Sequence, residues 1–308
     1  MSETQQTKEL TKSFKENFSN WYNKYYKILL FIPLIILFLS LYQLGTYYYK
    51  TGEFVQKDIS LTGGTSITIY TDLITNSVNF DSFENELKKE QVNIRKLTDL
   101  RSGKVNSFII ETTLKPDEIK PTIEKLLGYK LDNKNSNIEF TGSSLSKNFY
   151  KQLVTALIIS FILMSLIVFI LFRTFIPSVA VIFAAFSDII MALSLINFIG
   201  IKISAAGIAA FLMLIGYSVD TDILLTTRAL KRREINLNQR IYSAFKTGIL
   251  MTLTALIAVF PIFFISSGIP DSFRQIFIIL TIGLFADILN TWLTNASLIK
   301  WYCETRGI

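Results

Sequence analysis

Six long apolar stretches constrain what this chain can fold into more than any other feature of its sequence. Each is about as long as the roughly 20 residues that an α-helix needs to cross the hydrocarbon core of a membrane. The 308 residues are 50% hydrophobic and only 18% charged, against about 25% charged in soluble domains. An ordinary soluble globular protein is therefore excluded, and we predict a polytopic membrane protein that is mainly α-helical. The six helices are predicted at 27–47, 152–172, 176–199, 203–227, 244–266 and 275–299.

The first apolar stretch is predicted to stay in the protein as an uncleaved anchor. A cleavable signal peptide has a shorter apolar core and a cleavage site of small residues, whereas Tyr47, Tyr48, Tyr49 and Lys50 follow here. The long segment between the first and second stretches is large enough for a domain of its own. The predicted organisation is a tail at 1–26, a first helix at 27–48, a domain at 49–150, five further helices within 151–299 and a second tail at 300–308.

Basic residues predict how the chain is inserted in the membrane. They occur in the N-terminal tail, at Arg173 between the second and third helices, and from 228 to 240 between the fourth and fifth. These segments share one side if the helices alternate in direction, and the positive-inside rule assigns that side to the cytoplasm. We expect a multi-pass protein of the cell membrane with both termini cytoplasmic and residues 49–150 outside. Because topology accounts for the net charge of +7, nucleic-acid binding is not predicted.

The outer segment is predicted to form a small α+β domain. Its order of elements, βαββαβ, is that of a ferredoxin-like sandwich in which two helices cover one face of a sheet. The other face is expected to be uncovered, and an exposed sheet or sheet edge can bind an extended peptide by strand addition. The strands are predicted at 65–70, 94–100, 106–112 and 137–141, and the helices at 80–90 and 116–127.

Four aspartates lie inside the predicted membrane helices, where a charged side chain costs about 2.5–3.5 kcal/mol on insertion scales. They are Asp188 in the third helix, Asp220 and Asp222 in the fourth, and Asp287 in the sixth. A spacing of two residues corresponds to about 200° around a helix, so at most one of Asp220 and Asp222 faces the centre of the bundle. All four are candidate ion-coupling residues. The alternative is that they are protonated or hydrogen-bonded groups that hold helices together.

The two carboxylates of the fourth helix have different neighbours. Asp220 shares its face with Gly216 and Tyr217, which is typical of a tight helix contact. Asp222 shares its face with Ser218 and Thr226, which indicates a polar stripe. The two faces are therefore predicted to make different contacts.

Lys246, near the start of the fifth helix, is a further candidate. It either extends to the interface as a topology anchor or forms an ion pair with a carboxylate of the fourth helix. A short internal repeat indicates a repeated architecture, since 186–190 reads FSDII and 285–289 reads FADIL. Small residues at 205–210 allow neighbouring helices to approach closely, so the fourth helix is expected to be central.

Motifs typical of enzymes are absent from the sequence. There is no G-x-x-x-x-G-K-[ST] phosphate loop, no G-x-S-x-G elbow and no H-E-x-x-H zinc motif. The chain has no histidine and one cysteine, Cys303, which excludes imidazole ligands, a Ser-His-Asp triad and a cysteine-based metal site. We predict no enzymatic activity, no cofactor and no metal site.

The segment 215–228, IGYSVDTDILLTTR, resembles the fourth-helix signature of the SecD/SecF family of protein-export membrane proteins, in the archaeal form of its SecF branch. Three further features agree with that family. They are the sequence TGGT at 62–65, an aspartate in the third helix, and the layout of one helix, a large outer domain and five helices. The resemblance extends over almost the whole chain. The residues that carry it are Gly63, Gly64, Thr65, Gly216, Tyr217, Ser218 and Arg228.

The resemblance implies the smaller subunit of a SecD and SecF pair, within the resistance-nodulation-division superfamily of transporters. The partners that it implies are SecD, the Sec translocon channel and unfolded secretory polypeptides, with export driven by an ion flux through fourth-helix carboxylates. Bacterial members carry Asn-Asp-Thr where this chain has Asp220-Thr221-Asp222, so their central aspartate falls on Thr221 here. Lys246 falls roughly where those members have a basic residue in the fifth helix.

Two other functions remain open from the sequence. A small-molecule exporter of the same superfamily would need two copies of this unit, because one chain supplies six helices and one outer domain. A structural scaffold subunit without ion coupling would use the four aspartates only for helix packing. The partner separates these functions, since a related six-helix subunit favours protein export and a stable homotrimer favours the exporter.

Overall fold

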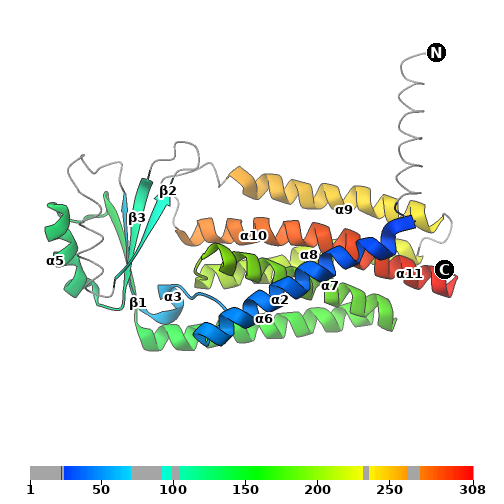
Figure 1. Cartoon of the computed structure of the whole chain (residues 1–308), viewed down its shortest axis with the longest axis horizontal. Coiled ribbons are helices and arrows are strands. Elements are labelled where there is room, and N and C mark those ends of the chain that lie inside the picture. The colour runs from blue at the N-terminus through cyan, green and yellow to red at the C-terminus, as the bar shows by residue number, and fades with distance from the viewer. Residues whose placement is uncertain are drawn as a thin grey trace, which may run out of the picture.

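Figure 1 shows a bundle of long helices with a small α+β domain at one end. The first described helix begins and the last one ends at the opposite end of the bundle, where Tyr26 Oη donates a hydrogen bond to Glu304 Oε2 at 2.7 Å. We refer to these as the domain end and the termini end. The computed structural model describes residues 22, 24–70, 92–98, 105–231, 236–261 and 271–307.

Six helices in the described part of the chain are long and apolar enough to cross a membrane, as the sequence predicts. The sixth is one continuous helical segment in which a π-helical stretch, η4, separates α10 from α11. The elements of these spans are α2 (Phe31–Thr51), α6 (Ser143–Phe172), α7 (Phe175–Ile199), α8 (Ala205–Lys231), α9 (Leu237–Val259), α10 (Asp271–Leu289), η4 (Asn290–Asn295) and α11 (Ala296–Arg306).

The predicted start of the fifth helix, at 244, is wrong, and the last residues of its predicted range 244–266 lie outside the described residues. α9 begins at Leu237 and ends at Val259. The first turn of α9 resembles a loop in the sequence because it contains the basic residue Arg240. In the structure this side chain is buried, and its Nη1 donates a hydrogen bond to the Ala229 carbonyl oxygen at 2.7 Å. A buried arginine that satisfies the end of a neighbouring helix is compatible with a helical start. The second and sixth predicted helices are also shorter than α6 and the α10–η4–α11 segment.

α8 is the central helix, as predicted, and packs against α6, α7, α9 and α10. Glycines allow α8 and α10 to approach closely. A Cβ atom at Gly207 of α8 would lie 2.6 Å from Gln275 Oε1, and one at Gly283 of α10 would lie 2.4 Å from a Leu214 methyl carbon. Larger residues at either position would separate the two helices.

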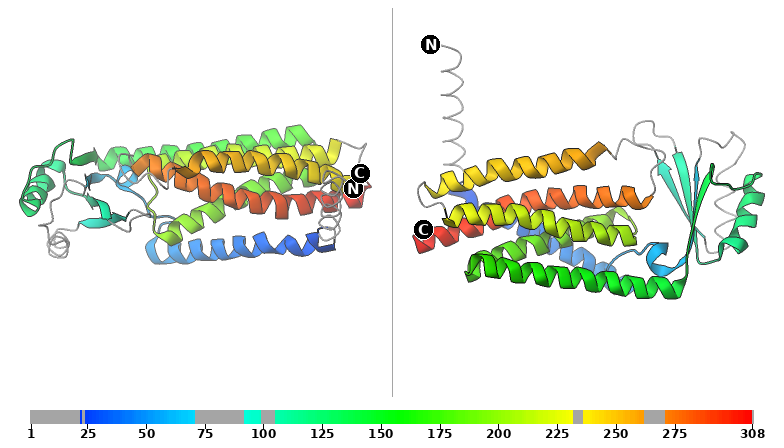
Figure 2. Two further views of the ribbon diagram at one scale, coloured as in Figure 1. Left: turned by 90° about the horizontal axis from the view of Figure 1, so that it is seen from above. Right: turned by 180° about the vertical axis from the view of Figure 1, so that it is seen from behind.

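α2 lies at one edge of the bundle and α6 at the opposite edge in the view from above in Figure 2. The buried residues of α2 are Pro33, Leu37, Ser40 and Leu44, which follow the spacing of three and four that forms a single helix stripe. Much of the rest of α2 is apolar and exposed. This pattern is expected of a helix that faces lipid or another subunit.

The domain contains a four-stranded antiparallel sheet of order β2-β3-β1-β4. This order is that of the predicted ferredoxin-like sandwich. The predicted helix at 80–90 lies outside the described residues. The predicted helix at 116–127 is confirmed as α5 (Pro116–Leu127). The strands are β1 (Gly64–Tyr70), β2 (Asn93–Thr98), β3 (Val105–Thr112) and β4 (Ser136–Thr141).

One face of the sheet packs against α5. Ile67 pairs with Ile110 across β1 and β3, and both side chains are fully buried together with Ile119 and Ile123 of α5. α5 begins with Pro116 at its first position and ends at Gly128 in the left-handed conformation, an arrangement that favours a sharp start and stop. The domain therefore has an apolar core of its own.

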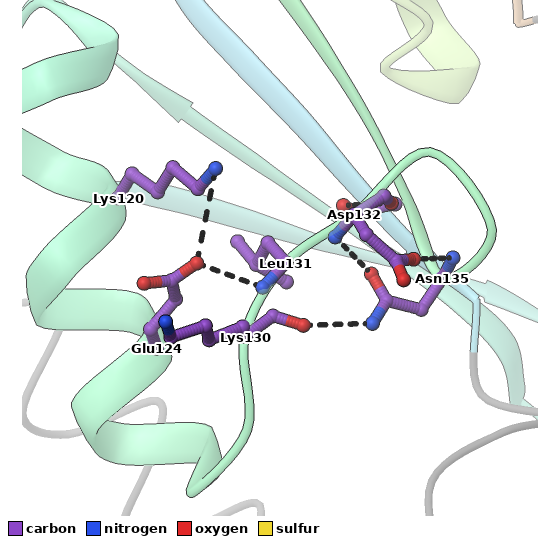
Figure 3. A network of polar contacts seen from close by, with 7 residues as sticks. Lys120, Glu124, Lys130, Leu131, Asp132 and Asn135 are labelled. Carbon is purple, nitrogen blue, oxygen red and sulfur yellow. Dashed lines mark hydrogen bonds and ion pairs between the residues drawn. The ribbon is translucent and has the colours of Figure 1, made fainter.

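Figure 3 shows the connection from α5 to β4. Glu124 Oε1 accepts a hydrogen bond from the Leu131 amide at 2.8 Å. Asn135 Nδ2 donates to the Lys130 carbonyl oxygen at 2.9 Å, and Asn135 Oδ1 accepts from the Asp132 amide at 2.8 Å. These bonds satisfy backbone groups of the connection and fix where β4 begins.

The glycine pair of the family motif forms the turn into β1. Gly63 ends the short helix α3 (Ile59–Thr62) with a φ of 87°, and Gly64 has a φ of 134°. A Cβ atom at Gly64 would lie 2.4 Å from the Thr112 carbonyl oxygen of β3. Thr65 Oγ1 donates a hydrogen bond to the Leu114 carbonyl oxygen at 2.5 Å. The motif residues at 63–65 therefore have a structural role.

We expect Gly64→Ala to destabilise the α+β domain by on the order of 2 kcal/mol, because alanine combines a disfavoured positive φ with a backbone clash. Amide hydrogen exchange of β1 and β3 in the full-length protein measures this, and protection should fall roughly 30-fold. Gly142→Ala is the matched control, since Gly142 has a φ of −67° and no atom lies within 4 Å of the position that an alanine Cβ would take there. Equal protection in the two variants would contradict the assignment.

The loop at 201–204, between α7 and α8, fastens the domain to the bundle, and we call it the clamp loop. Ile203 forms a parallel β-bridge with Lys57. Its amide donates to the Gln56 carbonyl oxygen at 2.6 Å, and its carbonyl oxygen accepts from the Asp58 amide at 2.9 Å. Gln275 of α10 accepts a hydrogen bond from the Ser204 amide at 2.9 Å.

The sequence predicts that the sheet face opposite α5 is uncovered. In the structure the centre of this face is covered, so the prediction is wrong there. Figure 1 shows this face turned toward the bundle. Glu111 of β3 points away from the α5 side and is only 3% exposed, and it forms an ion pair with Lys202 of the clamp loop. The edge strand β4 keeps exposed residues, including Asn137 and Glu139.

Candidate functional site

Three of the four predicted aspartates meet inside the bundle. Asp188 comes from α7, Asp222 from α8 and Asp287 from α10, and their exposed fractions are 0%, 0% and 1%. Polar side chains of α8 and η4 connect them by hydrogen bonds. Buried carboxylates require such partners, because an unpaired charge in an apolar interior is strongly unfavourable. We call these three residues the carboxylate cluster.

Asp188 is held by two donors. Ser218 Oγ of α8 donates to Asp188 Oδ2 at 2.5 Å, and Asn290 Nδ2 of η4 donates to Asp188 Oδ1 at 2.7 Å. Each carboxylate oxygen therefore has one partner. Asp188 connects α7 to both of the other helices of the cluster.

Thr291 links the other two carboxylates. Its Oγ1 lies 2.8 Å from Asp222 Oδ1 and 3.0 Å from Asp287 Oδ1. A threonine hydroxyl has one proton to donate, so it can donate to only one of these two oxygens. The other contact is a hydrogen bond only when the carboxyl group on that side is protonated and donates to Thr291. Thr291 therefore lies between the two carboxyl groups and can donate to either of them.

Thr221 lies between Asp287 and a backbone carbonyl of its own helix. Thr221 Oγ1 lies 3.1 and 3.3 Å from the two oxygens of Asp287 and 2.8 Å from the Ser218 carbonyl oxygen. Here too one hydroxyl proton faces two acceptors. If Asp287 is protonated, it can donate a hydrogen bond to Thr221 or to Thr291. That threonine then needs to donate to only one acceptor.

Asp222 accepts two hydrogen bonds at one oxygen. Its Oδ1 accepts hydrogen bonds from Thr291 Oγ1 at 2.8 Å and from Asn295 Nδ2 at 2.7 Å. Two donors to one oxygen stabilise a carboxylate. Its Oδ2 is buried and has no hydrogen-bond partner among the described residues.

The π-helical stretch η4 supplies three of these partners. Asn290, Thr291 and Asn295 all lie in it, and the Ala296 amide bonds to the Thr291 carbonyl oxygen, which is the i→i+5 pattern. In this stretch Asn290 contacts Asp188, whereas Thr291 and Asn295 contact Asp222. π-Helical turns inside α-helices occur frequently at functional sites.

Sequence reasoning missed η4 and its polar side chains. The available signal was the run of polar residues Asn290, Thr291, Thr294 and Asn295 within an otherwise apolar helix. All four are buried. Such a run inside a membrane helix indicates contacts with other polar groups, because lipid offers none.

The structure places Asp220 away from the cluster. Asp220, Gly216 and Tyr217 are exposed on the outer surface of α8, whereas Ser218 and Asp222 are buried. The two carboxylates therefore occupy opposite faces of α8, as their spacing predicts.

The basic candidates also lie apart from the cluster. Lys246 is exposed on α9, and among the described residues it forms no ion pair with a carboxylate of α8. Arg228 Nη1 donates to the Ser243 carbonyl oxygen at 2.5 Å and to Thr247 Oγ1 at 2.9 Å. Arg228 therefore joins the ends of α8 and α9 at the termini end.

A bundle of six candidate membrane spans with linked carboxylates at its centre defines a multi-pass membrane protein of the transport class. Residues 122–305 match the family described as "Protein export membrane protein SecD/SecF, C-terminal". The chain belongs to the SecD/SecF family of protein-export membrane proteins.

Its relatives include archaeal SecF proteins. The chain is 37% identical to the protein-export membrane protein SecF of Methanolacinia petrolearia, over 90% of this chain and 93% of the relative. It is 36% identical to SecF of Methanocaldococcus jannaschii, over 91% of this chain and 96% of the relative. These values extend the family assignment over nearly the whole chain, including the outer domain.

The fold is similar to the crystal structure of SecDF from Thermus thermophilus, which is described as a translocon-associated membrane protein. The TM-score is 0.70 at 18% identity, and the match covers 94% of this chain. The chain spans 38% of the length of that SecDF chain. In the present chain, Thr221 contacts Asp287 of α10.

Proposed function

We propose that this chain is an accessory subunit of the Sec protein-translocation machinery, which pairs with SecD and promotes polypeptide export by coupling it to an ion gradient. The observation that carries this proposal is the pair of carboxylates on opposite faces of α8. Asp222 belongs to the buried cluster and Asp220 lies on the outer surface. One helix thus connects a site that binds protons with a surface that needs a partner.

The outer surface of α8 has features that favour a contact with a partner subunit. It carries Met213 and Tyr217, both 50% exposed, together with Gly216 and Asp220. Ionisable side chains within membrane helices almost always face protein or a water-filled cavity rather than lipid. No atom lies within 4 Å of a Cβ position at Gly216, so another helix can approach closely there. SecD is the partner that the family assignment favours for this surface.

The carboxylate cluster supports ion coupling. Because Thr291 can donate to only one carboxylate, moving a proton from Asp287 to Asp222 would reverse the hydrogen bond between Thr291 of η4 and Asp222 of α8. A proton that reverses bonds between two packed helices favours a different packing of those helices. This is the event that we assign to the ion gradient.

The outer domain supports a contact with unfolded polypeptide at β4. In the described residues β4 pairs with β1 along one side only, and a free strand edge can add an extended chain through backbone hydrogen bonds. Such bonds need no particular sequence, which suits many unrelated secreted clients.

Affinity purification in mild detergent tests the proposal. The tagged full-length chain should retain SecD, and a strain that lacks the chain should export a secreted reporter poorly. A stable homo-oligomer without SecD would favour a small-molecule exporter instead. Normal export in the absence of the chain would favour a structural scaffold.

We expect the termini end to be cytoplasmic and the α+β domain to be outside. A cysteine introduced at Lys130, which is exposed in the domain, should react with an impermeant thiol reagent in intact cells. A cysteine introduced at Arg306, exposed at the termini end, should react only after the membrane is permeabilised. The natural Cys303 is buried and serves as the unlabelled background. The opposite labelling pattern would contradict this orientation.

A further inference from the structure

We propose that α2 covers one side of the carboxylate cluster and that the buried Lys300 of α11 holds this cover in place. The inference goes beyond the proposed function, because it concerns how the cluster is shielded and involves no bound ion. α2 lies along one edge of the bundle (Figure 2) and packs against α7 and η4. These two elements supply Asp188 and its partner Asn290.

One layer of apolar side chains separates α2 from the cluster. Leu37 of α2 packs with Met191 of α7 and Ala286 of α10, and all three side chains are buried. Met191 Sδ lies 3.4 Å from Asn290 Nδ2, which donates to Asp188 Oδ1 at 2.7 Å. Without α2, this side of the cluster would be open to the surroundings of the bundle.

Apolar contacts alone hold α2 weakly. Its buried residues form one narrow stripe, whereas Phe31, Phe38 and Tyr42 are exposed. Lipid tails are as apolar as these side chains, so packing and hydrogen bonds decide whether a membrane helix stays on its neighbours. One polar attachment is the hydrogen bond that Ser194 Oγ of α7 donates to Gln43 Oε1 of α2 at 3.0 Å.

The second polar attachment centres on Lys300 at the termini end. Lys300 is only 1% exposed, and its Nζ donates to Asn238 Oδ1 of α9 at 2.9 Å. The same Nζ lies 4.8 Å from the ring centre of Tyr26 and 5.3 Å from that of Tyr22, which both precede α2. An ammonium group over aromatic rings is attracted most strongly where water is excluded. The two rings therefore keep the segment that leads into α2 against α11.

Two hydrogen bonds strengthen this second attachment. Tyr26 Oη donates to Glu304 Oε2 at 2.7 Å, and Ser297 Oγ donates to the Tyr26 carbonyl oxygen at 3.0 Å. Ser297, Lys300 and Glu304 follow one another at spacings of three and four residues, which places them on one face of α11. That face therefore binds Tyr26 through its ring, its hydroxyl group and its backbone.

Thiol labelling of the purified full-length protein in detergent tests the cover. Met191→Cys places a thiol beneath α2, and Val219→Cys places one where α8 packs with Val168 of α6. Both are made in a Cys303→Ala background, which removes the natural thiol. Lys300→Met should raise the rate at which N-ethylmaleimide labels the Met191→Cys thiol about tenfold or more, because labelling of a buried thiol follows local opening. The Val219→Cys thiol should stay within about twofold of its original rate.

Lys231→Met is the matched control, because Lys231 is exposed at the end of α8, and it should change neither rate. Tyr26→Phe combined with Ser194→Ala removes one hydrogen bond at each attachment and keeps the ammonium group. This double variant tests the cover even where Lys300→Met does not fold, and it should raise labelling of the Met191→Cys thiol alone. Unchanged labelling of that thiol in the double variant would overturn the proposal. Equal increases at both thiols would also overturn it, because the whole bundle would then have loosened.

Discussion

Asp222→Asn is expected to lower export of a secreted reporter by roughly tenfold, a typical size for the coupling between linked sites. The asparagine oxygen can still accept the hydrogen bonds from Thr291 and Asn295 that Asp222 Oδ1 accepts now. The fold and the amount of protein should therefore be retained. What is lost is the second carboxylate to which, in the proposed coupling, a proton on Asp287 would move. Pulse-chase labelling of the reporter measures the rate of export.

The matched control for this experiment is Asp220→Asn. Asp220 lies on the outer surface of α8, and an amide keeps its size and its capacity for hydrogen bonds. Export should stay within about twofold of the unsubstituted rate, since exposed positions outside the network contribute little. A tenfold defect at Asp220 with normal export in Asp222→Asn would mean that the outer carboxylate couples the ion.

Gly216→Leu is expected to separate the chain from SecD, with recovery of SecD in a mild-detergent purification falling roughly tenfold. Close approach of membrane helices depends on small residues at their contact. No atom lies within 4 Å of a Cβ position at Gly216, so leucine fits the subunit itself and would clash only with a partner. The measurement is the ratio of SecD to tagged chain after purification.

Gly45→Leu provides the same substitution at a second open glycine. Gly45 is exposed in α2 and also has no atom within 4 Å of a Cβ position. SecD recovery should be unchanged in this variant. Loss of SecD in Gly45→Leu alone would assign the partner to α2 rather than to α8.

Much of the architecture could be predicted from the sequence because it depends on periodicity and length. Apolar length gives the number of spans, and alternation gives the four strands. The opposite faces of Asp220 and Asp222 follow from helix geometry alone. The internal repeat around Asp188 and Asp287 predicts a repeated architecture, and both residues belong to the cluster.

The rest depends on contacts that a linear pattern does not contain. The π-helical turn of η4 has no composition of its own, and it is stabilised where Asn290 and Asn295 reach carboxylates of two other helices. The early start of α9 depends on Arg240, which bonds to the Ala229 carbonyl oxygen. The covered centre of the sheet depends on the ion pair between Lys202 and Glu111. Each is a tertiary interaction that overrides a local preference.

The clamp loop determines how movement within the bundle would reach the α+β domain. It ends at Ser204, one residue before α8 begins, and it bonds to α10 as well as to Glu111 of the sheet. A helix transmits an axial shift along its length, and one residue corresponds to about 1.5 Å. A shift of α8 past its neighbours would therefore move the sheet in the same direction along the helix axis. The outer domain would then translate with α8, and a client held at β4 would travel the same distance.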